Sequence, residues 1–237
     1  MKTALIIRII AFIAISIWFA KRKGISAKYK SKLIQTENDS PIDFGYKSVW
    51  IAVRTNNKQK IAEILNLNDI KPSNWKSGIE NAYVNSIYIT PQIGKWTLAV
   101  GMKLVSGDSK ENIEELEKIL NKLSLEFGEA QFFGTHRVVE YHNWMKSING
   151  KTERIYAYIG ESGENIKVYG KPTEIEKDLN LFNSFSKEAE DENYWDRDDL
   201  IFANEELLMK ISENWSINPT KLTKRTDITD ELGLLCE

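Results

Sequence analysis

The segment EYHNWMKSINGKTERIYAYIG, residues 140–160, decides the fold of this chain. Asn149 and Gly150 form the strongest short signal for a two-residue β-hairpin turn, and aromatic and branched residues flank them on both sides. In such a hairpin Trp144 faces Ile155, and this kind of cross-strand pair stabilises adjacent strands. The segment therefore predicts two antiparallel strands joined by a tight turn.

The same register places Lys146 opposite Glu153, so that opposite charges face each other. A helix over residues 138–150 is the alternative, because apolar residues also recur there at helical spacing and a glycine can end the helix. The residues concerned are Val138, Tyr141, Met145 and Ile148, followed by Gly150. We favour the hairpin because of its turn signal and its two favourable cross-strand pairs.

Strand and helix signals alternate over the rest of the chain without the regular spacing of βαβ units. Further strands are predicted at 46–55, 86–90, 95–101, 129–135 and 165–170. Helices are predicted at 58–67, in 71–83 with Ser73 as cap, at 110–127 with Asp108 or Ser109 as cap, briefly at 173–176, and from about 200 to 215. This order favours an α+β fold with a mostly antiparallel sheet and packed helices.

Composition indicates a globular protein: 42% of residues are apolar and 28% are charged. We expect a polar linker at 24–45, a globular α+β domain at 46–185, and an acidic loop and helical segment at 186–237 that packs on the same domain. The net charge of −2 gives no support to nucleic-acid binding. The single cysteine, Cys236, has no intrachain partner and lies in a tail that we expect to fray.

An apolar run from Ala4 to Ala20 opens the chain. As a helix, at about 1.5 Å per residue, it spans about 26 Å, which is enough for a thin bilayer core. We predict a transmembrane signal anchor at 1–23 with a basic flank, because bulky Trp18 and the following lysines fit poorly with cleavage by a signal peptidase. The anchor residues would be Leu5, Ile9, Phe12, Ile15 and Trp18.

Charge predicts the orientation of this anchor. Six basic residues follow the run, at 21, 22, 23, 28, 30 and 32, whereas only Lys2 and Arg8 lie at its other end. Cytoplasmic flanks carry the excess of lysine and arginine. The sequence therefore predicts a single-pass protein of the inner membrane whose C-terminal domain is cytoplasmic.

Two stretches, FGEAQFFGTHRVVEYHNW (127–144) and RIYAYIGESGE (154–164), resemble a family of uncharacterised bacterial proteins with a domain of unknown function. The resemblance covers about Phe44 to Leu222 and excludes the apolar run. It implies no activity. Some small bacterial domains of this general kind are immunity or partner-binding proteins, which is an argument by analogy.

Both histidines of the chain lie in this region, in the pattern His136-x-x-x-Glu140-x-His142. On one strand the three side chains would project to one face, as the ligands of a metal or as an acid–base group. On a helix only His136 and Glu140 would be neighbours. Against both readings stands a structural one, in which the histidines are partly buried and Arg137 pairs with Glu140.

No phosphate-binding loop or nucleophile elbow is present, and we expect no cofactor. Trp195 lies in the acidic loop beside Tyr194 and Arg197, where an exposed aromatic residue can anchor a protein partner. Two hypotheses follow. The first is a membrane-tethered cytoplasmic binding module, of the kind that includes immunity proteins; the second is a small metal-dependent or acid–base enzyme centred on the two histidines and Glu140.

Overall fold

The computed structural model describes residues 32–236, and the chain from Lys32 onward forms one compact unit. Its centre is a sheet of nine strands in the order β2-β9-β3-β4-β1-β5-β6-β7-β8, in which all neighbours are antiparallel. The predicted α+β class with an antiparallel sheet is confirmed. The predicted anchor at 1–23 lies outside the described residues. Among residues 32–236, no helix is both long enough and apolar enough to cross a membrane.

The bounds of the elements are as follows. The strands are β1 (Ser48–Val53), β2 (Lys71–Ser73), β3 (Ile87–Ile89), β4 (Thr97–Val100), β5 (Glu129–His136), β6 (Tyr141–Ile148), β7 (Lys151–Ile159), β8 (Glu164–Tyr169) and β9 (Gly233–Cys236). The helices are α2 (Lys58–Ile64), α3 (Trp75–Ala82), α4 (Lys110–Phe127) and α5 (Glu205–Trp215), with 3₁₀ helices η1 (Lys187–Glu190), η2 (Glu192–Asp196) and η3 (Pro219–Lys224).

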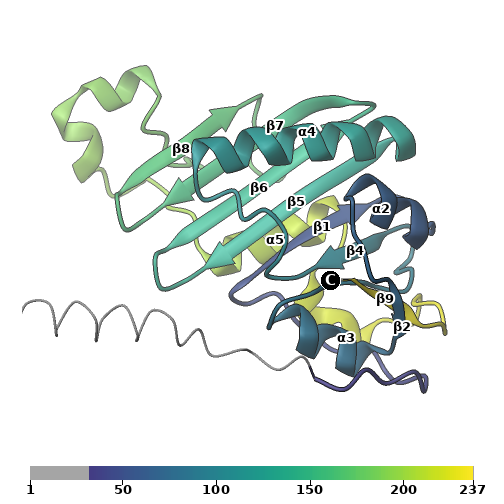
Figure 1. Ribbon diagram of the computed structural model, residues 1–237. Helices are drawn as coiled ribbons and strands as arrows, with labels where there is room; N and C mark the ends of the chain where they lie inside the picture. Colours follow the sequence, from purple (N-terminus) through teal and green to yellow (C-terminus); the bar gives the residue numbers. More distant parts are fainter. Residues whose placement is uncertain (1–31, 237) are drawn as a thin grey trace, which may run out of the picture. The chain divides into compact units, whose positions relative to one another are not determined.

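Helices cover both faces of the sheet, which gives three layers (Figure 1). One core lies between the sheet and α2 and α4, and it includes Ile51, Phe132 and Met145. The other lies between the sheet and α3 and α5, and it is rich in aromatic residues such as Trp50 and Trp144. Because alternate residues of a strand point to opposite faces, each central strand contributes to both cores.

Local signals predict the helices to different extents. Helix α4 has the predicted bounds, with Ser109 as its cap and Gly128 after its end. Helix α3 is capped by Asn74, so the predicted cap at Ser73 is wrong. Helix α5 begins at Glu205, about five residues later than predicted, because the Asn204 side chain caps the helix by accepting a hydrogen bond from the amide of Leu207. Residues 173–176 form a turn and no helix.

The central hairpin is confirmed as β6 and β7, and the helical alternative is wrong. Asn149 and Gly150 both have positive φ, as a two-residue turn of type I′ requires. The predicted pairs are wrong by one residue, because the register shifts between Lys146 and Ser147. Ser147 lies opposite Thr152 and Lys146 lies opposite Arg154, so Glu153 is the extra residue of a bulge. Trp144 therefore pairs with Tyr156.

The C-terminal strand β9 corrects a second expectation. Cys236 is fully buried in β9, which pairs with β2 on one side and β3 on the other. The predicted frayed tail is therefore wrong, because three paired strands enclose this end of the chain. Burial also raises the pKa of the Cys236 thiol to about 11, so the thiol stays protonated and unreactive at neutral pH.

Residues 32–45, predicted as part of a polar linker, form an arm along α3. The Asp39 carboxylate accepts hydrogen bonds from the first two amides of α3, at Trp75 and Lys76. The Asn81 side chain binds both the amide and the carbonyl of Lys32. The polar side chains that suggest a linker are thus the groups that fix this arm to the domain.

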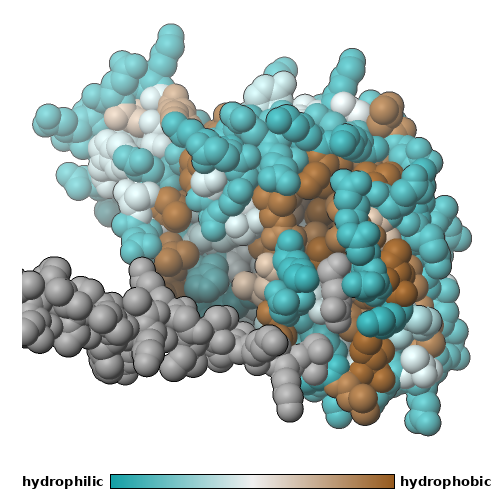
Figure 2. Space-filling view, viewed as in Figure 1, coloured by the Kyte–Doolittle hydropathy of each residue, from teal (hydrophilic) through white to brown (hydrophobic). Residues whose placement is uncertain are grey.

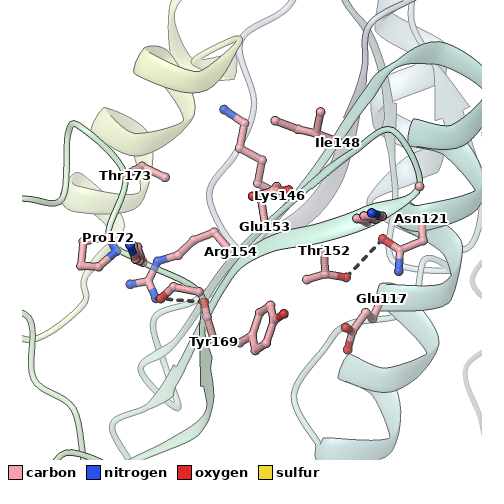
Figure 3. A pocket seen from close by; sticks show the side chains of 14 residues that line it. Glu117, Asn121, Lys146, Ile148, Thr152, Glu153, Arg154, Tyr169, Pro172 and Thr173 are labelled. Atoms are coloured by element: carbon pink, nitrogen blue, oxygen red, sulfur yellow. Dashed lines mark hydrogen bonds between the residues drawn. The ribbon is translucent and has the colours of Figure 1, made fainter.

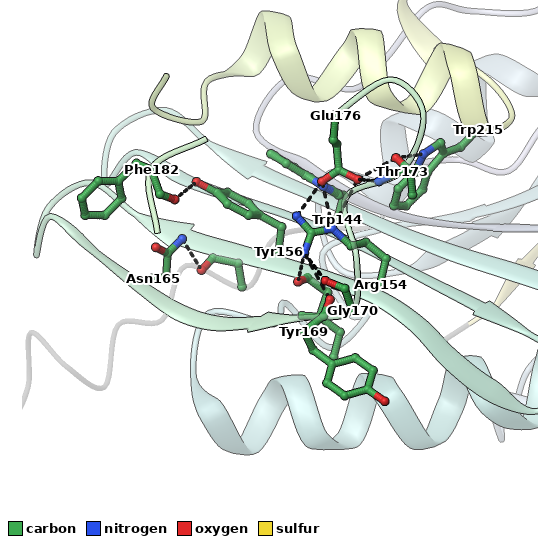
Figure 4. Close-up of polar contacts among 12 residues, drawn as sticks. Trp144, Arg154, Tyr156, Asn165, Tyr169, Gly170, Thr173, Glu176, Phe182 and Trp215 are labelled. Atoms are coloured by element: carbon green, nitrogen blue, oxygen red, sulfur yellow. Dashed lines mark hydrogen bonds and ion pairs between the residues drawn. The ribbon is translucent and has the colours of Figure 1, made fainter. Parts of the chain in front are cut away.

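A buried ion pair joins the hairpin to the loop after β8 (Figure 4). The Arg154 guanidinium donates to both oxygens of Glu176, at 2.8–3.2 Å, and both side chains are almost fully buried. Trp144 Nε1–H and Thr173 also donate to the same carboxylate. The remaining guanidinium nitrogen donates to the carbonyls of Ile155 and of residues 169 and 170. Every charged atom of the pair therefore has a partner.

Substituting Glu176→Gln should lower the free energy of unfolding by about 3–5 kcal/mol, because it leaves the buried Arg154 without its counter-ion. Urea unfolding at pH 7 measures the loss. Glu174→Gln is the matched control: this exposed residue forms an ion pair with the exposed Lys177, and we expect a change within about 0.5 kcal/mol. Equal effects of the two substitutions would contradict the structural role of the pair.

Acid should weaken the same ion pair. Burial raises the pKa of Glu176, but Arg154 and Thr173 outweigh this effect and hold the pKa below its ordinary value of 4.5. The pair thus stabilises the fold above that ordinary value, and its contribution is lost as the pH falls through the folded pKa.

Candidate functional site

A groove of about 820 Å³ lies at the start of β7 (Figure 3). Several of its polar side chains already have partners within the fold. Arg154 is held by Glu176, Thr152 donates to Asn121 at 3.2 Å, and Lys146 pairs with Glu129, outside the groove, at 3.1 Å. Within residues 32–236, none of the side-chain polar atoms that are sealed without a partner belongs to a residue lining this groove. Arg154, Thr152 and Lys146 thus serve the fold.

A second pocket, of about 470 Å³, lies where β5, β6 and β7 meet the start of α5. We call it the His142 pocket. His142 and Tyr158 come from the sheet, Arg137 and Glu140 come from the turn between β5 and β6, and residues 202–206 form the opposite wall. The turn is held in place because the Gly160 amide donates to the carbonyl of Glu140 at 3.0 Å.

The two histidines lie on opposite faces of the sheet. His142 pairs with Thr135 across β5 and β6, whereas His136 pairs with Tyr141. Since neighbouring residues of a strand alternate, His142 faces α5 and His136 faces the α4 side. The expected convergence of His136, Glu140 and His142 on one face is therefore wrong, because a turn separates the histidines. Within residues 32–236, no three His, Cys, Asp or Glu side chains form a group that could hold a metal ion.

His142 is part of a short hydrogen-bonded chain. Its Nδ1 atom lies 3.0 Å from the hydroxyl of Thr135, and this hydroxyl lies 3.5 Å from a carboxylate oxygen of Glu205. A carboxylate only accepts, so the Thr135 hydroxyl donates to Glu205 and accepts from Nδ1–H. We therefore assign the Nδ1–H tautomer to the neutral imidazole of His142, which leaves Nε2 as an acceptor.

Burial keeps this imidazole neutral. Only 3% of His142 is exposed, and desolvation of the charged form lowers its pKa to about 4. The carboxylate of Glu205 is too far from the ring to reverse the effect, because Thr135 stands between them. At neutral pH the pocket thus presents an uncharged nitrogen acceptor.

A cluster of aromatic side chains lies beside this pocket. Fully buried Phe182 is its base: Phe202 stacks on it with ring centroids 4.8 Å apart, and Trp195 packs on it at 5.2 Å. Its outer members are exposed, with 46% of Trp195 and 41% of Phe202 accessible to solvent. Phe185, which is 59% exposed, borders the same pocket as Trp195. Phe202 also lines the His142 pocket, so the cluster and the pocket are continuous.

The loop around this cluster is acidic and ordered. Residues 186–199 contain seven acidic and two basic residues, a net charge of −5. Tyr194 is buried and accepts a hydrogen bond from the amide of Asn183 at 2.8 Å. Arg197 pairs with Glu188 and Asp199 at 2.8 Å each. Of the predicted binding residues, Trp195 is thus available to a partner, whereas Tyr194 and Arg197 hold the loop in shape, and Arg137 lies at the His142 pocket.

We call Phe185, Trp195 and Phe202, together with loop 186–199, the aromatic–acidic surface. Figure 2 shows that the end of the domain that carries η1 and η2 is mostly hydrophilic, with smaller hydrophobic areas between the hydrophilic atoms. Thr135, Glu205 and Phe202 were missed as site residues. Of these three residues, only Glu205 could be recognised from a local pattern, because it directly follows Asn204, the residue that caps α5, and so lies in the first turn of that helix.

Comparisons of the chain with protein-family models, with curated proteins and with solved structures give no match. The resemblance to uncharacterised bacterial proteins stays a prediction. The chemistry of the site therefore has to be inferred from its own residues.

Stability should fall between pH 6.5 and pH 4 because of His142. Its folded pKa is about 4 and its unfolded value is 6.5, so in this range only the unfolded chain binds the proton. The loss from this residue is up to roughly 3 kcal/mol. Urea unfolding at several pH values measures it, by difference between the wild type and His142→Gln.

His136→Gln is the control for this experiment, since the chain has only two histidines. We expect His136→Gln to keep the pH dependence and His142→Gln to lose most of it. A ring signal of His142 that titrates near pH 6.5 in the folded protein would refute the assigned environment.

Proposed function

We propose that this protein is a membrane-tethered binding module that holds a basic protein partner on its aromatic–acidic surface. The observation that carries the proposal is the exposure of Trp195 and Phe202, which both pack on buried Phe182, and of Phe185, which borders the same pocket as Trp195, beside loop 186–199 with its net charge of −5. Large aromatic side chains at a fixed position are typical anchors of protein interfaces. An immunity-type role, in which the module covers a toxin, is one specific case.

The charge of the loop determines the kind of partner. An acidic surface accelerates association with a basic one and disfavours acidic proteins and nucleic acids. The loop also keeps its shape without a partner, because its 3₁₀ helices are capped by Ser186 and Asp191. Little conformational entropy is therefore lost on binding.

The electrostatics of the His142 pocket favour binding over acid–base catalysis. A general base works best with a pKa near the working pH, and a pKa of about 4 makes His142 a weak base at neutral pH. Glu140 shares the pocket, but His136 lies on the other face of the sheet. The second hypothesis, an enzyme built on these three residues, thus loses one of its members.

The tether in this proposal is the apolar run Ala4–Ala20 with its basic flank. Its support is the sequence itself: the length of the run and the excess of lysine and arginine behind it. In the described chain, the arm from Lys32 is fixed along α3. The proposal therefore assigns the tether to the residues before this arm and partner binding to the aromatic–acidic surface.

Alanine at Phe185 or Trp195 should weaken partner binding about 10- to 100-fold, because each removes an exposed anchor. A photo-crosslinking amino acid at position 185 or 195 of the full chain, expressed in its own cells, identifies the partner by mass spectrometry. We expect one dominant crosslinked protein, joined through a basic segment.

Leu125 is the matched control, since 74% of this apolar residue is exposed and it lies near the end of α4, whereas the start of α4, at Lys110, borders the pocket of Phe185 and Trp195. A crosslinker there should not capture the same protein, and Leu125→Ala should not weaken binding. Thermal unfolding of each variant shows whether the fold is retained. Crosslinks of equal yield from positions 125 and 195 would exclude the proposed surface.

The tether predicts that the full chain stays with membranes during alkaline carbonate extraction and that deletion of residues 1–31 releases it. Protease added outside intact cells should leave the domain uncut. The idea fails if the mature protein is trimmed near residue 20, or if external protease digests the domain.

A further inference from the structure

The His142 pocket contains an acceptor that the other described residues, within 32–236, do not use. The Nε2 atom of His142 has no hydrogen-bond partner among residues 32–236 and is not among the atoms sealed from solvent, although 97% of the residue is buried. Since His142 lines the pocket, Nε2 is open to it. A buried acceptor of this kind suits a ligand with an N–H or O–H donor.

The charges around the pocket restrict the ligand further. Glu140, Glu205 and Glu206 line it, with Arg137 as the only basic residue, and His142 is neutral at physiological pH. An anion is disfavoured, even though the pocket contains the start of α5, because Asn204 already binds a free amide there and acidic residues occupy the first turn. The lining favours a cation.

The walls of the pocket favour a flat cation. Phe202 is exposed on one side and Tyr158 lies beside it, with ring centroids 6.0 Å apart. Aromatic faces attract cations, and the planar guanidinium stacks on them while its N–H groups bind acceptors in the ring plane. Glu205 and Nε2 of His142 supply such acceptors in the same pocket.

We propose that the His142 pocket binds a guanidinium group, supplied by an arginine side chain of the partner that the aromatic–acidic surface holds. This inference rests on the proposed function for the source of the arginine but not for the chemistry of the pocket. In it, Glu205 carries the counter-charge, Nε2 of His142 accepts one N–H, and Phe202 covers the guanidinium plane. His142 and Thr135 together position Glu205.

Titration of the full chain in detergent with arginine amide tests the chemistry of the pocket. The chain carries only two histidines, so ¹³C-labelled histidine gives two ring signals, which His136→Gln assigns. We expect saturable movement of the His142 signal, with a dissociation constant on the order of 1 mM for so small a ligand. Citrulline amide, the neutral analogue of the same shape, should bind at least about tenfold more weakly than arginine amide.

Glu205→Gln should weaken the binding of arginine amide at least about tenfold, because it removes the counter-charge and keeps the shape. Glu213→Gln is the control on the same helix: Glu213 pairs with Lys221 and does not line the pocket. Equal binding of arginine amide and citrulline amide, or equal effects of the two substitutions, would overturn the guanidinium site.

Competition separates this inference from the proposed function. If the partner supplies the arginine, saturating arginine amide and Glu205→Gln should both reduce the crosslink from position 185, while Glu213→Gln does not. If arginine amide binds but the crosslink is unaffected, the arginine does not come from the partner, and that part of the inference is overturned. If arginine amide fails to bind while Phe185→Ala still weakens partner capture, the pocket assignment falls and the proposed function stands.

Discussion

The ion pair between Arg154 and Glu176 is the contact on which the second half of the domain depends. It joins the central hairpin to the loop after β8, and through Thr173 it reaches the indole of Trp215 on α5. Removing two charges from water costs free energy unless all of their hydrogen bonds are satisfied. Here four groups donate to the Glu176 carboxylate: the Arg154 guanidinium, the Trp144 indole, and the amide and hydroxyl of Thr173. The segment that carries Phe182 follows Glu176 directly in the chain. The position of the aromatic–acidic surface is thus set by a buried charge pair at some distance from it.

The bulge at Glu153 makes this pair possible. Without the extra residue, Arg154 would point to the α4 face, because a shift of one residue moves a side chain to the other side of the sheet. With the bulge, Arg154 lies opposite Lys146 in the strand register, and its side chain lies on the α5 face of the sheet together with Trp144. The same alternation separates His136 from His142 on the neighbouring strands. The alternation of side chains along the strands therefore brings Arg154 to Glu176 in the core, and it brings His142 instead of His136 to the pocket.

The His142 pocket and the aromatic–acidic surface form one continuous region through Phe202. The pocket supplies a neutral acceptor and carboxylates, and the surface supplies exposed rings and negative charge. Under the proposed function, these groups bind a basic, partly apolar protein. Rigidity is part of this chemistry, because Tyr194 and Arg197 hold the loop by hydrogen bonds and ion pairs instead of contacting a partner.

Local patterns in the sequence determined much of the fold: the hairpin at Asn149-Gly150, the bounds of α4 and the antiparallel class. These features depend on neighbours a few residues apart, such as the cap at Ser109 and the glycine after Phe127. Of the site, the sequence indicated Glu140, His142 and Trp195, but it did not indicate Thr135 or Glu205. Only the tertiary structure decided that Cys236 lies in the sheet, that residues 32–45 bind α3, and that the two histidines face opposite layers. The first two depend on contacts between residues far apart in the chain, and the third depends on the turn between β5 and β6, and neither leaves a periodic signal in the sequence.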